Sequence, residues 1–172
     1  MDSGRNYSPG LIRQYSKKPS ESDDWLRRIH VAEVLDLSDL MSVSDKIHEI
    51  DCIDLVVVDN LAGILNLSGQ PGGIKRQREL FSALESMRTT VNESGIHLAL
   101  TGHTRHDWRT GEARPIGGNV LGHDVDSVVR VDWINSTTDI VRFSIERSPS
   151  SSSGTSIILK LERSGLKSIR SL

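Results

Sequence analysis

Residues 53–60 read IDLVVVDN, an apolar and largely β-branched run that ends in a carboxylate and an amide. A run of this kind, without polar alternation, is typical of a parallel strand that is covered on both faces. A second run, IHLAL at residues 96–100, ends in the polar residues TGH at 101–103. Between the two lies a segment of helical length, so the chain predicts a right-handed strand–helix–strand crossover. We therefore expect an α/β fold with Asp59 at the carboxyl edge of its sheet.

The connecting helix is expected from about Lys75 to Glu93, and Gly95 ends it. Apolar residues recur through this segment at helical spacing, which predicts one buried stripe. The residues of the stripe are Leu80, Phe81, Leu84, Met87 and Val91. A turn-rich stretch, NLSGQPGG at 66–73, precedes the helix.

The first fifty residues predict shorter elements. A helix is expected to begin near Pro9 and to end before Pro19, with a polar loop at 20–24. A short strand is expected over 29–34, and Ser38 is expected to cap the next helix. The apolar residues on the buried side of that helix are Leu40, Met41, Ile47 and Ile50.

The last third of the chain predicts short strands over 128–131, 140–145 and 157–161, separated by turns. They are expected to form an antiparallel meander at the edge of the sheet. The serine-rich segment 148–156 is expected to be a solvated hairpin loop. The predicted fold class is α/β: a mostly parallel sheet flanked by helices, with antiparallel strands at its C-terminal edge, in one domain over residues 1–172.

Composition narrows the class of partner. The 172 residues carry 21 Lys and Arg against 23 Asp and Glu, a net charge of −2, which excludes a histone-like polycation. Any contact with nucleic acid must therefore come from a local basic loop. No apolar run approaches the roughly 20 residues of a membrane span, so no membrane partner is expected. The single Cys52 leaves no intramolecular disulfide, fits a reducing cytoplasm, and is expected to be buried and inert.

The two strand ends are the first candidate site. A carboxylate such as Asp59, followed by Asn60, points into the crevice where open α/β sheets bind ligands, and there it would hold Mg²⁺ against nucleotide phosphates. The alternative is an aspartate that only caps the following turn. His103 ends the neighbouring strand, where it would contact a terminal phosphate or serve as an ordinary structural residue.

A second candidate site is the basic loop that follows His103. Arg105, Arg109 and Arg114 are suited to phosphate contacts, and Trp108 is suited to stacking on a base. The alternative is a charged surface loop with no ligand.

The next segment makes the order of motifs recognisable. After the basic loop comes PIGGNVLGH at 115–123, and then the strand VVRV at 128–131. Together with the strand that ends at Asp59 and the strand end LALTGH, this order resembles the RecA/RadA recombinase superfamily, in particular the archaeal RadA and RadB group and the eukaryotic recombinase paralogs. The opening MDSGRNYSPGL resembles the family segment I-D-T-E-x-x-F-x-P-x-R-L. Residues 146–149 and 164–166 resemble its closing hairpin, so the resemblance covers nearly the whole chain.

The resemblance implies an ATP and Mg²⁺ site. Asp59 matches the acid that coordinates Mg²⁺, with Asn60 beside it, and His103 matches the Gln or His that senses the γ-phosphate. Two departures weaken this site. No G-x-x-x-x-G-K-[ST] occurs, so the phosphate cradle is absent from this sequence, and the family's catalytic Glu falls on Gly4. The chain therefore looks like the C-terminal part of an ATPase core or a regulatory paralog, and it is not expected to hydrolyse ATP alone.

The resemblance also implies binding to single-stranded DNA and to related subunits or further copies of the chain. Residues 66–75 match the first DNA-binding loop and residues 104–118 the second, in which the arginines would face phosphates. Gly117 and Gly118 would let the backbone approach the strand. The family works in the cytoplasm, or in the nucleus of eukaryotes. The alternatives are a KaiC-like or helicase-like module of the same fold, or a non-enzymatic interaction module.

Overall fold

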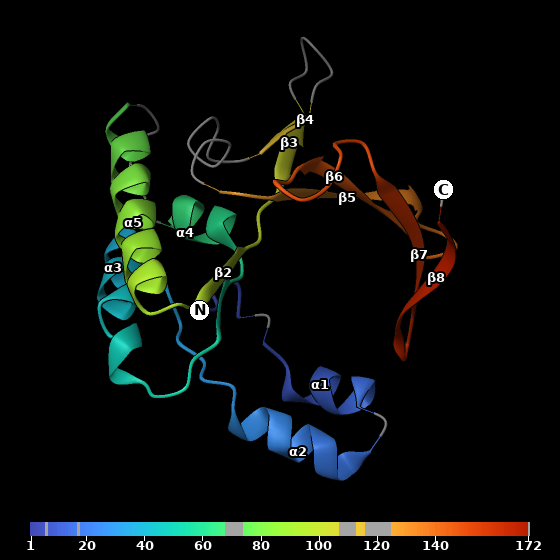
Figure 1. Ribbon diagram of the computed structural model, residues 1–172, viewed down its shortest axis with the longest axis horizontal. Coiled ribbons are helices and arrows are strands. Elements are labelled where there is room, and N and C mark those ends of the chain that lie inside the picture. The colour runs from blue at the N-terminus through green and yellow to red at the C-terminus, as the bar shows by residue number, and fades with distance from the viewer. Residues whose placement is uncertain (6, 17, 68–73, 107–112, 116–124, 172) are drawn as a thin grey trace. The chain divides into compact units, whose positions relative to one another are not determined.

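The computed structural model describes residues 1–5, 7–16, 18–67, 74–106, 113–115 and 125–171. Its elements, shown in Figure 1, are α1 (Pro9–Tyr15), α2 (Pro19–Arg27), α3 (Leu37–Ser44), the 3₁₀ helix η1 (Ile47–Glu49), β1 (Leu55–Val58), α4 (Leu61–Leu67), α5 (Ile74–Glu93), β2 (His97–Leu100), β3 (Thr104–His106), β4 (Ala113–Pro115), β5 (Val128–Asn135), β6 (Ile140–Arg147), β7 (Ser156–Glu162) and β8 (Gly165–Ser171).

The chain groups into two compact units. One comprises Met1–Tyr7 and His30–Asp124, and the other comprises Ser8–Ile29 and Val125–Leu172. The first holds a small parallel sheet with helices, and the second holds a four-stranded antiparallel sheet with two helices. The expected α/β class is thus confirmed, but among the described strands the parallel part of the structure is small.

The parallel strands of the first unit are β1 and β2. They pair in register from Leu55 with His97 to Val58 with Leu100, and α5 connects them as predicted. The opening residues extend this arrangement by isolated parallel bridges, in which Asp2 pairs with both Asp59 and Glu33. Asp2 therefore lies between Glu33 and Asp59, at the carboxyl end of β1.

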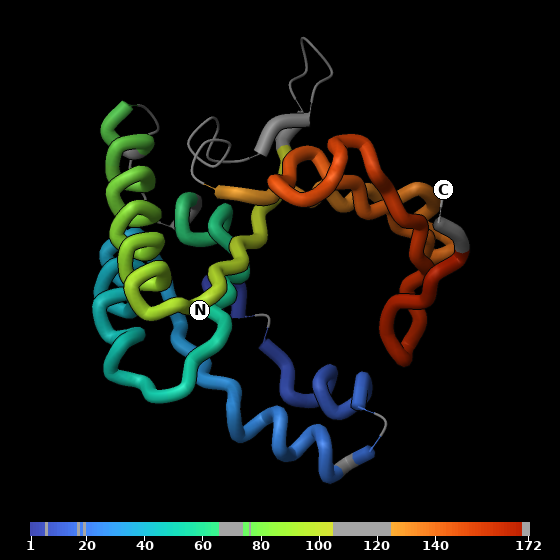
Figure 2. Tube along the Cα trace, in the orientation of Figure 1, coloured from blue at the N-terminus to red at the C-terminus, as the bar shows by residue number. Residues whose placement is uncertain are grey.

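The core of the first unit lies on one face of this sheet. Val58 is fully buried, and the α5 stripe of Leu80, Leu84, Met87 and Val91 is buried with it, as the periodicity predicts. Burying an aliphatic side chain of this size stabilises the fold by about 1.5–3 kcal/mol. Figure 2 follows the same region as a tube, from α3 through η1 into β1.

Three expectations about burial are wrong. Phe81 is 48% exposed, because it lies one residue, about 100° around the helix, from the stripe residue Leu80. Leu55 is 55% exposed, because alternate residues of β1 point to opposite faces and only one face is packed in the described residues. Cys52 is exposed in the turn before β1, where its φ is 61°.

The region before β1 differs from its prediction in three further ways. Residues 20–24 are not a loop but lie in α2, which has Pro19 in its first turn and buries Ser22. Residues 29–34 form no strand: Glu33 makes only an isolated parallel bridge to Asp2. The next helix is capped by Asp36 rather than Ser38: the Asp36 carboxylate accepts the backbone N–H of Asp39.

That helix also buries fewer residues than expected. Leu40 and Ile47 are buried, but Met41 and Ile50 are 38% and 37% exposed. The helix ends at Ser44, so Ile47 lies in η1 and Ile50 follows it. A single helical stripe therefore does not extend to Ile50.

The second unit contains the predicted meander, in the order β5-β6-β7-β8. The serine-rich segment is the loop between β6 and β7, as expected. Within the described residues these strands form a sheet of their own, so their expected place at the edge of the parallel sheet is not seen. In this unit the Gln14 side chain in α1 donates to the carbonyl of Arg163 at 2.7 Å, which joins α1 to the β7–β8 turn.

The register gives the antiparallel sheet two unlike faces. One face carries Val129, Val131, Trp133, Val141, Phe143, Ile145, Ile157, Leu159, Leu161 and Leu166. The other face carries Arg130, Asp132, Arg142, Ser144, Lys160 and Lys167, together with the apolar residues Ile140 and Ile158. Much of the apolar face is open to solvent, since Val129, Val131 and Trp133 are 55–57% exposed.

None of the helices in the described part of the chain has the length and apolar character that a membrane crossing needs.

Candidate functional site

The ends of β1 and β2 bring the first predicted site residues together. The Thr101 hydroxyl, directly after β2, donates to Asp59 Oδ1 at 2.5 Å. The Thr101 backbone N–H continues the ladder to the Val58 carbonyl at 3.0 Å. Because a hydroxyl bonded to a carboxylate is a charge-assisted interaction, Thr101 fixes the direction in which the Asp59 side chain points.

Asn60 joins β1 to the first turn of α4. Its Oδ1 accepts the backbone N–H of Gly63 at 2.6 Å, as a helix-capping side chain does. Its backbone N–H donates to Ser3 Oγ at 3.0 Å, and Ser3 Oγ donates to the Asn60 carbonyl at 2.6 Å. The peptide bond between Asp59 and Asn60 is cis.

His103 is held beside Asn60. Asn60 Nδ2 and His103 Nε2 lie 3.4 Å apart, and the rest of the imidazole is exposed. Asp59, Asn60 and His103, which the sequence singles out separately, are thus linked through Thr101 and Asn60 at one edge of the sheet.

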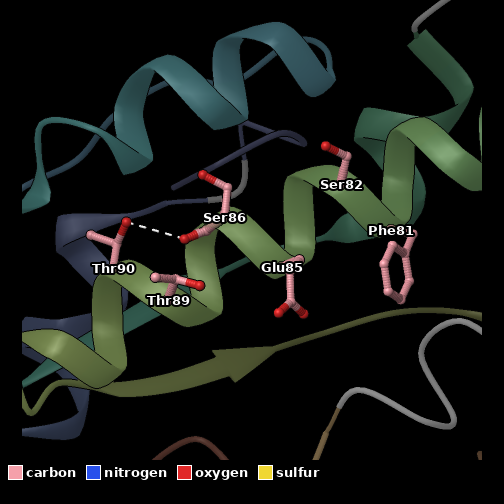
Figure 3. A pocket seen from close by; sticks show the side chains of 6 residues that line it. All are labelled: Phe81, Ser82, Glu85, Ser86, Thr89 and Thr90. Atoms are coloured by element: carbon pink, nitrogen blue, oxygen red, sulfur yellow. Dashed lines mark hydrogen bonds between the residues drawn. The ribbon is translucent and has the colours of Figure 1, made fainter.

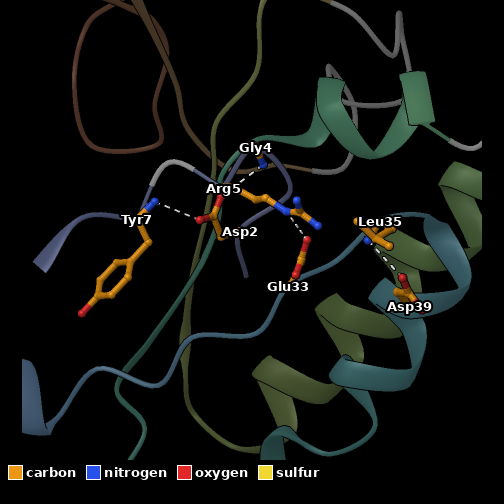
Figure 4. Close-up of polar contacts among 7 residues, drawn as sticks. All are labelled: Asp2, Gly4, Arg5, Tyr7, Glu33, Leu35 and Asp39. Carbon is orange, nitrogen blue, oxygen red and sulfur yellow. Dashed lines mark hydrogen bonds and ion pairs between the residues drawn. The ribbon is translucent and has the colours of Figure 1, made fainter.

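The opening segment adds side chains that sequence reasoning did not assign to the site (Figure 4). The Asp2 carboxylate accepts the backbone N–H of Gly4 at 3.1 Å and that of Tyr7 at 2.8 Å. Arg5 pairs with Glu33 at 2.5 Å across the neighbouring segment. An aspartate two residues before a glycine is the sequence signal for such a turn.

Two opposing effects act on the Met1 α-amino group at this edge of the sheet. Burial lowers the pKa of the Met1 α-amino group below its ordinary value, while the charges of Asp2 and Asp59 act in the opposite direction. The same amino group donates to the Val57 carbonyl at 2.8 Å. Burial is the larger effect, and the two carboxylates do not offset it.

The residues fit Mg²⁺ only in part. Among the residues that the structure describes, no group of three or more His, Cys, Asp or Glu side chains is arranged to hold a metal ion. Mg²⁺ in nucleotide sites is commonly held by one or two carboxylates together with phosphates and water. Asp59 suits that role, with Oδ1 fixed by Thr101, but this edge is not a metal cage made of protein ligands alone.

The basic loop after His103 is flanked by two short strands, β3 and β4, which form a β-hairpin. β3 and β4 pair antiparallel, and Arg105 stands directly opposite Arg114 in the register. The remaining residues predicted for this loop, Trp108, Arg109, Gly117 and Gly118, lie outside the described residues. In the other predicted loop, 66–75, α4 extends to Leu67 and α5 begins at Ile74, and 68–73 are also outside the described part.

A surface concavity of about 460 Å³ lies on α5 (Figure 3). Its lining residues are Phe81, Ser82, Glu85, Ser86, Thr89 and Thr90. All of them belong to one helix, and the Thr90 hydroxyl is already bonded to the Ser86 carbonyl at 3.1 Å. The concavity is lined by none of the predicted site residues.

Comparison with known proteins gives one kind of match. No family model matches the chain. No curated protein matches its sequence. Among solved structures, the chain is similar to the crystal structure of the RadB recombinase, with a TM-score of 0.78 and 19% identity, over 98% of this chain and 77% of that one. At this identity the match shows that the chain shares the fold of that structure.

Proposed function

We propose that this chain is a RecA/RadB-type DNA repair and recombination protein, or a regulatory relative of such proteins, that binds single-stranded DNA through the β3–β4 hairpin. The observation that carries the proposal is the register of Arg105 against Arg114, in a hairpin that leaves the sheet at His103. Like charges directly opposite each other destabilise an antiparallel pair, and a phosphate between them removes that cost. The RadB-like fold supports the same assignment.

The nucleotide site is proposed to be incomplete. Asp59 and His103 address only a metal ion and a terminal phosphate, and this sequence lacks the glycine-rich loop and lysine that hold the other phosphates. Gly4 has no side chain to polarise a water molecule. We therefore expect no saturable ATP binding below the millimolar range and no hydrolysis by this chain alone.

Binding to single strands should be weak and sensitive to salt. Each neutralised phosphate contributes about −0.7 to the log–log salt slope, so three arginines predict a slope of roughly −2. The acidic residues Asp107 and Glu112 within the loop reduce it. Stacking of a base on Trp108 would add about 1–3 kcal/mol without sequence preference.

Fluorescence anisotropy with a labelled single-stranded oligonucleotide, repeated over a salt series, tests the proposal. Replacing Arg105, Arg109 and Arg114 together by Ala should flatten the slope. The matched control replaces Arg27, Arg88 and Arg163, which are exposed and carry the same total charge, and should keep the slope of the parent.

Two results would favour the non-enzymatic interaction module instead. One is a parent chain that does not bind at low salt, and the other is a triple variant that binds as well as the parent. Nucleotide-dependent ring assembly would instead indicate a KaiC-like or helicase-like module.

A further inference from the structure

We propose that Asn60 selects the tautomer of His103, so that the site presents the Nδ1–H of a neutral imidazole to an anionic oxygen. The nature of that ligand, a phosphate, rests on the proposed function. The choice of tautomer rests only on the hydrogen bonds around Asn60.

The orientation of the Asn60 amide follows from its hydrogen bond with the backbone N–H of Gly63. Oδ1 is 2.6 Å from the backbone N–H of Gly63, which can only donate. A reversed amide would place its NH₂ group against this N–H, two donors facing each other. The oxygen must therefore point to α4, and the NH₂ group must point to His103.

The second partner of the Asn60 amide, His103, can then adopt only one neutral tautomer. The amide NH₂ has no lone pair to offer, so His103 Nε2, 3.4 Å away, must be the acceptor in this contact. An imidazole that accepts at Nε2 and is neutral carries its proton on Nδ1, since the bond made by one ring nitrogen sets the state of the other.

Packing around Asn60 holds the amide in this orientation. Ser3, which is 6% exposed, bonds to both the backbone N–H and the carbonyl of Asn60. On the α4 side, a Cβ added to Gly63 would lie 2.5 Å from Ser3 Oγ and 3.4 Å from Asn60 Oδ1. Hydrogen bonds from Ser3 thus hold the Asn60 backbone, and the first turn of α4 packs closely against the amide.

The arrangement gives Asn60 the role of a positioning residue for His103. His103 directly precedes Thr104, the first residue of β3, so its free Nδ1–H lies at the root of the arginine hairpin.

Nitrogen NMR of the chain labelled with ¹⁵N-histidine reads the tautomer directly, without DNA or nucleotide. The six histidines are separated by comparison with His103→Gln, in which one set of signals is lost. The spectra are recorded about two pH units above the ordinary histidine pKa of about 6.5, where imidazoles are neutral. We expect the Nδ1–H form of His103 to be the majority form in the parent.

Asn60→Asp is the decisive variant, because its carboxylate still accepts the Gly63 N–H but offers His103 only acceptors. The majority form should then change to Nε2–H. Ser82→Ala, at an exposed position of α5 outside the site, is the control, and it should keep the parent's ratio.

A parent with Nε2–H in the majority overturns the inference, whether or not the variants fold. An unchanged ratio in folded Asn60→Asp, or the same change in Ser82→Ala, also overturns it. A parent that shows Nδ1–H but does not bind single strands would retain the tautomer and remove the proposed function, so the two failures are distinguishable.

Discussion

At the scale of single residues, the candidate site depends on hydrogen bonds that fix side-chain directions. Asp59 owes its orientation to a hydroxyl on the neighbouring strand, and His103 owes its own to an amide at the start of a helix. The sequence placed Asn60 beside Asp59 as a candidate, but it did not indicate that the Asn60 amide meets His103 or that Thr101 bonds to Asp59.

Thr101→Val should destabilise the chain, because it keeps the shape of the side chain and removes the donor to Asp59 Oδ1. The expected loss is about 0.5–1.5 kcal/mol in the free energy of unfolding, at the lower end since both groups are partly open to water. Urea unfolding measures it. Thr104→Val, an exposed threonine at the start of β3, is the control and should change stability little.

At the scale of elements, α4 packs so closely against the opening segment at Gly63 that this contact should outweigh helix propensity. Gly63→Ala gains about 1 kcal/mol of intrinsic propensity, but its Cβ would lie 2.5 Å from Ser3 Oγ. We expect a net destabilisation, measured as a lower thermal midpoint. Gly10→Ala in α1 is the matched control: its Cβ meets Ser8 Oγ at an ordinary 3.6 Å, so stability should rise. Equal gains in both variants would contradict the close packing of α4.

A second prediction at this scale concerns the pKa of Glu162 in the β7–β8 hairpin. The hydrogen bond from Lys167 at 2.9 Å is the main reason that the pKa of Glu162 lies below its ordinary value of 4.5. A depressed carboxyl pKa stabilises the folded chain above pH 4.5, and this stabilisation is lost as the pH falls through the lowered folded-state pKa. Lys167→Met should therefore raise the pKa of Glu162 toward its ordinary value, as followed by carboxyl-carbon NMR.

Lys160→Met is the control for this titration, because its ammonium lies 3.9 Å from Glu162 and should matter less. A larger pKa change in Lys160→Met than in Lys167→Met would show that the hydrogen bond is not the main cause.

At the scale of the whole molecule, each unit taken by itself has exposed apolar residues on a sheet face, such as Leu55 and Val57 in the first unit and Val129 and Val131 in the second. Apolar patches of this kind on a folded chain mark surfaces for assembly. They support the proposal that the chain works with related subunits or with further copies of itself.

Val131→Asp tests this assembly, because Val131 lies on the apolar face of the antiparallel sheet and is 55% exposed. Light scattering should give the parent a mass above the 19.0 kDa of one chain, and the variant should be closer to it. Arg142→Asp, on the charged face, should keep the mass of the parent. A parent that is monomeric at tens of micromolar would rule out self-assembly.

The sequence by itself determined the main elements of the parallel sheet and of the C-terminal meander, but not α2, α4, β3 or β4. β1, β2, α5 and the C-terminal meander follow from contiguous apolar runs or from strong periodicity, and the βα-crossover rule then brings Asp59 next to the end of β2. These features are local or follow from chain order, so neighbouring residues are enough to predict them.

Only the tertiary structure decided how the site is held and which faces are covered. Ser3 meets Asn60 across 57 positions of the chain, and Thr101 meets Asp59 across 42. The exposure of Leu55 and Phe81 likewise depends on which elements pack against them. Contacts between residues this far apart depend on the path of the whole backbone, and no local pattern of residues encodes them.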